Sequence, residues 1–459
     1  MRMAAAPPAV SFNRHLRRTA VLAGPLAAGH LATGLIGFVD SVIAGRHGTA
    51  TLAAVSVGTA LFWLPMMIPM GTLMALPASV SQLHGAGQQA RIGPLFRQAL
   101  WLAAALGLAM LLLLSLLPLA LAPMGIDPAI RPGAAGFLHG IRWGVPALTV
   151  YLCLRYLCDG LHWSLPTMLF GLGGLLVLVP MGWALAFGHF GLPELGAAGL
   201  GYASAMMMWT QMLGFLLYLW RARRFADLGL FARLDAPRWP QIRELLGTGL
   251  PIGVTVAMEG GLFIVTALLI GRLGALPVAA HQIAINVASL AFMIPFGIAE
   301  ATTVRVSHAL GRGDRDGLRR AALAGYTLLL LTQTLGALAM LIGHHAIAGL
   351  YTTDVAVAAL AATLLLYAAA FQLSDGVQVV SAGALRGLKD TRVPMLLAAL
   401  AYWGIGMPVG AGLGLGLGWG PRGMWIGLIA GLTVAALMLA LRFWRSSARI
   451  AMNQPSAPA

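Results

Sequence analysis

The chain has 459 residues, of which 59% are hydrophobic and only 9% are charged. Soluble domains carry roughly 25% charged residues, so this composition excludes an ordinary soluble protein and indicates one that lies within a lipid bilayer. The formal net charge is +15, but the arginines are spread over alternate loops instead of forming one patch, which argues against a nucleic-acid partner.

Apolar windows of about 20 residues recur along the chain, and each is long enough to cross a hydrocarbon core of roughly 30 Å as a helix. They predict an all-α integral membrane protein with twelve transmembrane helices. The first six spans are expected at 20–44, 51–80, 94–118, 133–158, 165–187 and 195–220, and the second six at 245–271, 277–304, 318–342, 357–384, 393–415 and 421–444. The longer spans are expected to tilt or break at Pro65, Pro69, Pro77 and Pro295.

The arginines also predict the orientation of these spans. They collect before the first span, in the even-numbered loops and after the last span, whereas the other loops hold few. By the positive-inside rule, the segment 1–19, the even-numbered loops and the tail 446–459 are expected to be cytoplasmic. Residues 1–19 lack the apolar core of a secretory signal, so the first helix is the expected insertion signal.

The chain contains an internal repeat. A shift of 226 residues aligns residues 25–87 with the second half of the chain without a gap. The best-matched pairs are 44–48 with 270–274, 67–71 with 293–297, and 85–87 with 311–313. Each unit has six helices, an even number, so both units enter the membrane from the same side. Parallel repeats of this kind form transporters with a solute cavity between two lobes.

The repeat therefore predicts two pseudo-symmetric six-helix bundles. The first lobe is expected at 20–220 and the second at 245–445. The arginine-rich and less apolar stretch 221–244 is the expected cytoplasmic linker between them.

Four carboxylates lie within the apolar spans: Asp40, Glu259, Glu300 and Asp375. A charge near the bilayer centre costs about 2.5–3.5 kcal/mol on insertion scales. With only 14 acidic residues in the chain, these four are predicted to bind protons or inorganic cations, or to hold a cationic solute. The alternative is that they only form hydrogen bonds between helices.

Glu259 and Asp375 form the candidate ion site. Pro251 is placed in the first turn of the seventh helix, which puts Glu259 near the middle of the membrane. On the eighth helix, Gln282, Asn286 and Ser289 follow one another at i, i+4 and i+7 and form one polar stripe. Two carboxylates with amide oxygens can bind sodium or share a proton. An interhelical hydrogen-bond network is the alternative, and it is most open for Gln282 and Asn286.

The other polar positions are less distinctive. Asp40 is the only acid deep in the first lobe, and it is a candidate for binding a proton or a cationic solute. Glu300 lies near the end of its helix with Arg305 close in sequence, which suggests a structural ion pair. The loop residues Asp159 to His162 and the pair His344 and His345 could indicate a metal enzyme. They are predicted on opposite sides of the membrane, so they cannot form one site.

Several stretches carry a resemblance to a known family. They are Ala280-His-Gln-Ile-Ala-Ile-Asn286, 291–297, 300–306, 311–314, 372–375, 383–390 and 191–196. With them the chain resembles the multidrug and toxic compound extrusion (MATE) family in its NorM branch. The resemblance implies twelve helices in two bundles and export of organic cations driven by sodium or proton entry. It also implies that Glu259 and Asp375 are the coupling pair. Asp40 is then a proton or substrate site, to which we add Met66 and Phe292.

Two departures from the family pattern bear on coupling. Leu178 and Gly182 stand beside Pro180 where many members carry asparagines, and Phe371 stands where a tyrosine often precedes the helix 10 acid. Both changes favour coupling through Glu259 and Asp375 over coupling through the first lobe.

The expected partners are small cationic drugs or dyes and the bilayer of a bacterial inner membrane. The protein is expected to act as a monomer, with sodium or protons as coupling ion and no other cofactor. A lipid-linked oligosaccharide flippase is the alternative transporter, but it should line its cavity with cations. Only Arg142, Arg155 and Arg272 are expected near the membrane interior. A membrane-embedded enzyme would need a catalytic constellation on one face, and the motifs do not supply one.

Overall fold

The structure is a computed structural model that describes residues 11–233 and 235–452. The regular elements of these residues are helices, as the sequence predicts. In the first half they are α1 (Phe12–His47), α2 (Thr49–Leu73), α3 (Ala75–Gly85), α4 (Ile92–Ala120), α5 (Arg131–Ile141), α6 (Val145–Gly160), α7 (Leu165–Gly173), α8 (Leu175–Phe187) and α9 (Gly196–Arg221). In the second half they are α10 (Trp239–Gly271), α11 (Ala275–Gly311), α12 (Arg315–Tyr351), α13 (Val355–Gly387), α14 (Arg392–Ala399), α15 (Met407–Ala411) and α16 (Pro421–Met452).

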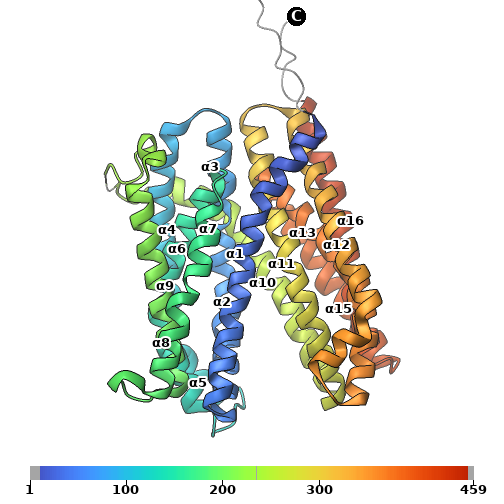
Figure 1. Ribbon diagram of the computed structural model, residues 1–459. Coiled ribbons are helices and arrows are strands. Elements are labelled where there is room, and N and C mark those ends of the chain that lie inside the picture. Colours follow the sequence, from blue (N-terminus) through green and yellow to red (C-terminus); the bar gives the residue numbers. More distant parts are fainter. Residues whose placement is uncertain (1–10, 234, 453–459) are drawn as a thin grey trace, which may run out of the picture.

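These helices account for the predicted spans. Within the described residues, 11 helical segments are long and apolar enough to cross a membrane. The twelfth expected span, 195–220, corresponds to α9, whose small and polar residues lower its hydropathy. In Figure 1, α9 lies beside α8 in the first half of the molecule, and it also packs against α5 and α6, so it takes its place in the bundle despite its composition.

Several helices extend beyond the predicted spans at the end that carries the termini. α1 begins at Phe12 and α10 at Trp239, while α16 continues to Met452. The predicted segment 221–244 therefore contracts to the residues between α9 and α10. The placement of Pro251 is also wrong, because it lies inside α10 and Pro240 occupies the first turn. A proline fits without cost at the first helical positions, but the sequence did not distinguish between the two.

The helix breaks follow proline chemistry only in part. The second span is interrupted at Met74, between α2 and α3, three residues before Pro77. Proline lacks the N–H group that would bond the preceding turn, which explains a break there. Pro65 and Pro69 lie inside continuous α2, and Pro295 lies inside continuous α11, so of the expected tilts or breaks no break occurs at these positions.

Three further spans contain interruptions that were not expected from the sequence. The fifth span is divided into α7 and α8 at Gly174. A 3₁₀ turn, η2 (Arg142–Gly144), separates α5 from α6 within the fourth span. The eleventh span contains two π-helical stretches, η5 (Leu400–Gly406) and η6 (Gly412–Gly416), on either side of α15. Such π segments are commonly found at functional sites.

The helices form two lobes that exchange their first helices. In Figure 1, α2 to α9 lie on one side and α11 to α16 on the other, with α1 and α10 between them. Leu22 and Leu26 of α1 belong to an apolar core shared with α11 and α13. Reciprocally, Leu245 and Ile252 of α10 are buried in the core of the first lobe. The first half of α1 thus packs against the second lobe, and the first half of α10 packs against the first lobe. These two contacts hold the lobes together.

Small residues allow these crossings, and the repeat places them symmetrically. A Cβ atom on Gly71 of α2 would lie 2.6 Å from the Cα atom of Gly253 on α10. The corresponding contact in the other half joins Gly297 of α11 to Ala27 of α1, where a Cβ atom would lie 2.6 Å from the backbone nitrogen. Backbones that approach this closely need glycine on at least one helix.

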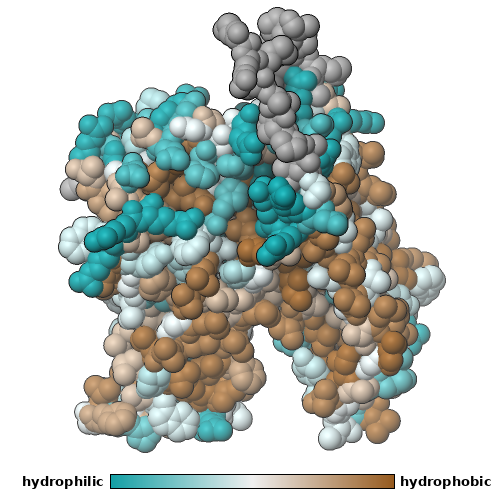
Figure 2. Space-filling model, turned by 45° about the horizontal axis from the view of Figure 1, so that its top comes forward, coloured by the Kyte–Doolittle hydropathy of each residue, from teal (hydrophilic) through white to brown (hydrophobic). Residues whose placement is uncertain are grey.

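The lobes meet at one end of the molecule and separate at the other. Near the termini, the end of α3 touches the end of α11, since a Cβ atom on Gly85 would clash with the His308 carbonyl group. Figure 2 shows hydrophilic residues gathered at this end and a gap between two largely hydrophobic lobes at the opposite end. The structure therefore represents a state that is open on a single side.

The linker between the lobes is fixed to the first lobe. The Arg97 guanidinium group of α4 pairs with Asp235 at 2.7 Å. The Gln98 side chain donates to the Ala236 carbonyl group at 3.0 Å and accepts from the Arg238 backbone at 2.6 Å. The hydrogen bonds from Arg97 also hold the pKa of Asp235 below its usual range.

Candidate functional site

A cavity of about 570 Å³ lies between the two lobes. Helices α1, α2, α5, α6, α7 and α9 line it from one lobe, and α10, α11, α13 and α14 line it from the other. Cavities of roughly 300–1,000 Å³ commonly hold drug-sized ligands. The predicted residues Asp40, Met66, Glu259, Phe292 and Asp375 all contribute to its wall.

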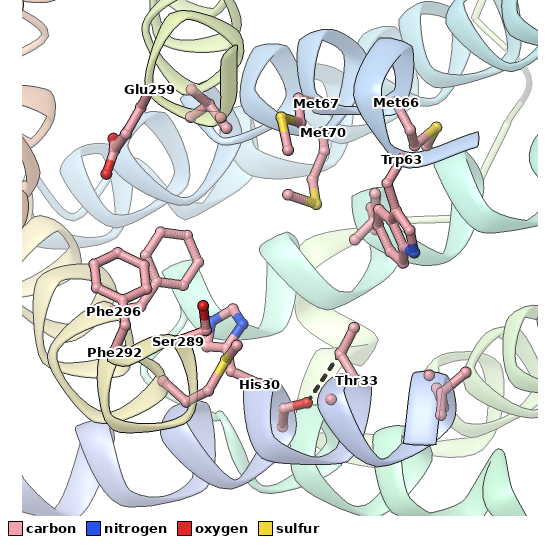
Figure 3. A pocket seen from close by; sticks show the side chains of 18 of the residues that line it. His30, Thr33, Trp63, Met66, Met67, Met70, Glu259, Ser289, Phe292 and Phe296 are labelled. Carbon is pink, nitrogen blue, oxygen red and sulfur yellow. Dashed lines mark hydrogen bonds between the residues drawn. The ribbon is translucent and has the colours of Figure 1, made fainter. Parts of the chain in front are cut away.

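The two apolar walls come from the same positions of the repeat. Trp63, Met66, Met67 and Met70 follow one face of α2 at spacings of three and four residues. Their counterparts under the repeat shift, Ser289, Phe292, Met293 and Phe296, follow the matching face of α11. Figure 3 shows the methionines and Trp63 on one side and Phe292 and Phe296, whose rings lie tilted against each other, on the other. Flexible thioethers opposite aromatic rings suit varied, cationic ligands.

Glu259 and Asp375 lie on neighbouring helices of the second lobe, α10 and α13. Asp375 is 4% exposed, Glu259 is half-buried, and the two carboxyl groups interact electrostatically. Gln378 lies beside Glu259, one turn beyond Asp375. Among the described residues, Asp375 Oδ1 and Gln378 Oε1 lack hydrogen-bond donors. Free acceptor oxygens beside paired carboxylates suit a proton or a hard cation such as sodium.

Tyr402 belongs to this group, and sequence reasoning missed it. It is fully buried in the π-helical stretch η5, and its hydroxyl oxygen accepts a hydrogen bond from Gln378 Nε2 at 2.5 Å. The phenol also interacts with both carboxyl groups. It therefore supplies a hydroxyl to this site although Phe371 lacks one. A tyrosine in the middle of an apolar span could have been recognised as a candidate from the sequence. The direction in which its side chain points, however, depends on the π-helical turn.

Gln282 and Asn286 are not brought to the carboxyl pair. Both are exposed, and neither lines the cavity. The Asn286 side chain instead accepts a hydrogen bond from the Tyr351 hydroxyl at 2.8 Å. Ser289 is the member of the predicted stripe that lines the cavity, and Ile285 takes the place one turn before it. The cavity extends along α11 as far as Ser289 and Ile285, but it does not reach Gln282 or Asn286.

Asp40 lies in the first lobe with few polar neighbours. It is 6% exposed, and its Oδ1 atom has no hydrogen-bond partner among the described residues. Ser204 of α9 lies beside it. On α8, Leu178 is fully buried, and a Cβ atom on Gly182 would approach Ile43 at 3.2 Å, so this side of the lobe is packed with apolar groups.

A buried ion network joins the lobes at the inner end of the cavity. Glu300 of α11 is paired with His30 of α1 at 2.9 Å and with Arg155 of α6 at 3.2 Å. Arg155 also pairs with Asp159 at 3.4 Å, and Asp159 accepts a hydrogen bond from Thr167 at 2.6 Å. All of the charged members of this network are at most 12% exposed.

The network corrects two predictions. The partner of Glu300 is not Arg305, which donates instead to the His15 carbonyl group at 2.6 Å. Residues five apart on a helix do not share a face, whereas three or four apart do. Asp159 is not in a loop, because it lies in the last turn of α6 and is buried.

Arg386 follows the predicted span 357–384 and was therefore expected in a loop. It lies within α13, is 7% exposed and lines the cavity. Its guanidinium group approaches Met74 Sδ at 3.8 Å and interacts electrostatically with Glu259 and Glu300. Of the three arginines expected near the membrane interior, only Arg155 lines the cavity, while Arg142 and Arg272 do not.

The sequence matches the family model named MatE twice, at residues 25–184 and 251–411. The two matches begin at Pro25 and Pro251, which are partners under the repeat shift. They cover more than half of the chain and include most of the helices that line the cavity, while α9 lies outside both matches.

Two curated relatives and one solved structure extend this result. The "Probable multidrug resistance protein NorM" of Xanthomonas axonopodis pv. citri is 66% identical over 452 residues, which cover 98% of this chain and 99% of the relative. The protein of the same name from Xanthomonas campestris pv. campestris is 66% identical over 96% of both chains. A solved structure described as the "outward-facing conformation of a multidrug resistance MATE family transporter of the MOP superfamily" has a TM-score of 0.87. It is 17% identical and is covered over its full length by 98% of this chain, so it shows a shared fold.

Proposed function

The chain belongs to the MatE family, in the NorM branch of multidrug resistance transporters, and from this premise we propose that it exports lipophilic organic cations in exchange for sodium or protons. The observation that supports this proposal is one cavity between two lobes that contains acids from both lobes and apolar walls. A transporter of this family is not an enzyme. The exported solute and the coupling ion are the parts that require an experiment.

We place ion coupling at Glu259 and Asp375. Their carboxyl groups, with Gln378 and Tyr402, can capture an incoming ion on the open side of the cavity. A potential of 100 mV supplies about 2.3 kcal/mol per elementary charge, but only if a site captures the ion that crosses. Capture of the ion neutralises the second lobe, weakens its attraction for a bound cation and releases the cation outward. The lobes then close on the open side and separate at the other end.

The proposed function is tested by efflux of a cationic dye from proteoliposomes. Sodium and proton gradients are imposed separately at the same membrane potential. Efflux that follows one of the two gradients identifies the coupling ion. Equal dye movement with and without either gradient would contradict an antiporter.

Substitution of Asp40 should act on the substrate more than on coupling. Asp40→Asn is expected to weaken the binding of a permanently cationic dye by roughly 1–2 kcal/mol, because it removes a partly desolvated charge contact. Binding is measured by fluorescence titration of the purified protein. Ion-driven efflux of a zwitterionic substrate should survive. If dye affinity is unchanged and efflux no longer responds to the ion gradient, the first lobe contains the coupling site instead.

We also propose that both termini and the linker are cytoplasmic in a bacterial inner membrane. Arg233 is exposed in the linker, so Arg233→Cys provides a label site. The native Cys153 and Cys158 are buried and free, and they are replaced by alanine in the background. An impermeant maleimide should label this cysteine in inside-out vesicles and not in intact cells. Labelling of intact cells would reverse the orientation.

A flippase for an anionic lipid-linked sugar fits the cavity less well. Arg155 and Arg386 do line the inner end of the cavity. Arg155 forms ion pairs with Glu300 and Asp159, and Arg386 is under the electrostatic influence of Glu300 and Glu259, so these acids offset both cations. A cavity with compensated cations has little net attraction for a pyrophosphate group.

A further inference from the structure

Three histidines from distant parts of the chain meet at the closed end of the molecule, outside the drug cavity. They are His84, His162 and His308, and each offers a ring nitrogen within 4.8 Å of those of the other two. His84 and His162 belong to the first lobe, whereas His308 belongs to the second. The ring of His308 lies 4.8 Å from that of His162 and 5.4 Å from that of His84, measured between centroids.

The backbone fixes this arrangement. His84 and His308 occupy the last turns of α3 and α11, which cross with their backbones in contact at Gly85 and Gly311. His162 follows the end of α6 in a left-handed backbone conformation, with φ of 60°. That conformation is uncommon for a residue with a Cβ atom, and here it holds the third imidazole against the other two.

The ring nitrogens are available as ligands. The Nδ1 atoms of His84 and His308 are buried and have no hydrogen-bond partner among the described residues. The His308 ring also donates to the Ser81 carbonyl group. Histidines that bind metals commonly donate their other N–H group to a backbone carbonyl in this way. All three side chains remain partly exposed, so an ion can reach them from solvent.

The electrostatic surroundings contain opposing contributions. Arg18, Arg224, Arg305 and Arg312 are close enough to act on these imidazoles. Against this, the carboxyl-terminal ends of α3, α6 and α11 converge here, and each carries a partial negative charge that favours a cation. The Arg305 guanidinium is engaged by the His15 carbonyl group, and that of Arg224 lies 4.2 Å over the Trp163 ring.

We propose that His84, His162 and His308 form a binding site for Zn²⁺ that bridges the two lobes. Three imidazoles with an open fourth position are an established donor set for this ion. Tetrahedral geometry with Zn–N bonds near 2.0–2.1 Å needs nitrogens roughly 3.4 Å apart. The ring nitrogens lie within 4.8 Å of one another, so they need to approach by at most about 1.4 Å.

The site has a consequence for transport. This consequence rests on the proposed function, in which the lobes close at one end and separate at the other. Because the ligands come from both lobes, they are together only while this end is closed. An ion that binds one state and not the other shifts the population toward the state that it binds. Zn²⁺ on this side is therefore a clamp that holds the cavity open toward the opposite side and stops export.

Binding is tested on tag-free protein in lipid nanodiscs, since a polyhistidine tag would itself bind zinc. Calorimetric titration with Zn²⁺ should give one ion per chain, and Co²⁺ should give the visible absorption of a tetrahedral site. His84→Gln, His162→Asn and His308→Gln should each weaken binding by roughly tenfold or more, by comparison with the cost of losing even an outer-shell partner. Asparagine is chosen at position 162 because it tolerates a left-handed backbone.

The matched control is the double variant His344→Gln, His345→Gln, which removes an adjacent histidine pair of α12. It should bind Zn²⁺ as the unmodified protein does. No binding by the unmodified protein, or equal binding by the three site variants, would overturn the site. This measurement uses neither a drug nor a gradient, so it is independent of the proposed export function.

The clamp is tested in inside-out vesicles, where the closed end faces the added solution under the proposed orientation. Zn²⁺ should inhibit dye transport by the unmodified protein, a chelator should reverse the inhibition, and His308→Gln should be resistant. If Zn²⁺ binds to the three histidines and transport is equally fast with and without it, the clamp is wrong.

Discussion

Glu259→Gln and Asp375→Asn should each abolish ion-driven export while the protein still inserts and folds. The two carboxyl groups interact within one cavity wall, and Gln378 with Tyr402 completes their surroundings. Neutral amides are close in shape to the acids but can neither take up a proton nor neutralise a cation. Removal of either charge therefore removes the step at which the ion gradient does work on the protein. Efflux from proteoliposomes under separate sodium and proton gradients measures the loss.

The control is Glu244→Gln on the same helix as Glu259. Glu244 is exposed and pairs with Lys389 at 3.4 Å outside the cavity. The Glu244→Gln variant should export at the normal rate, because an exposed ion pair contributes at most about 1 kcal/mol to stability. Gradient-driven export near the normal rate by both Glu259→Gln and Asp375→Asn would remove the pair from the mechanism. Loss of export in the control as well would point to damage to the helix instead.

Arg155→Met should lower stability more than any other single change in the ion network. Arg155 pairs with both Glu300 and Asp159, so its loss takes the guanidinium group from two buried acids, although Glu300 keeps its contact with His30. Removal of one partner of a buried ion pair typically costs about 3–5 kcal/mol. Glu300→Gln should cost less, since Arg155 keeps Asp159 and the amide still accepts a hydrogen bond. Thermal unfolding in nanodiscs compares the variants.

A combined variant separates charge from packing. Adding Glu300→Gln and Asp159→Asn to Arg155→Met removes the acids that were left behind, and it should recover much of the lost stability. Arg142→Met is the control, because Arg142 lies against the Trp143 ring and does not line the cavity. If Arg155→Met is no more destabilising than Arg142→Met, the network does not hold the lobes together.

The architecture followed from properties that are local along the chain. A span is recognised because about 20 apolar residues in sequence can cross a bilayer, whatever they pack against. Both lobes were visible because the duplicated halves retain similar residues at equal spacing, from Pro25 and Pro251 onward. The acids were conspicuous because each is costly in an apolar span. For the same reason Asp40, Glu259 and Asp375 could be singled out, and the cavity contains all three.

The partners of those residues were decided by the tertiary structure. Hydropathy gives the depth of a residue in the membrane, and helical spacing gives the face of the helix on which it lies. Neither shows which helix of the other lobe packs against that face. The ion pair of Glu300 with Arg155 depends on how α11 crosses α6, and the position of Tyr402 depends on a π-helical turn. The histidine cluster requires three helix ends to converge across the interface between the lobes. Side chains with no local signal became neighbours because small residues such as Gly85 and Gly311 let the backbones touch.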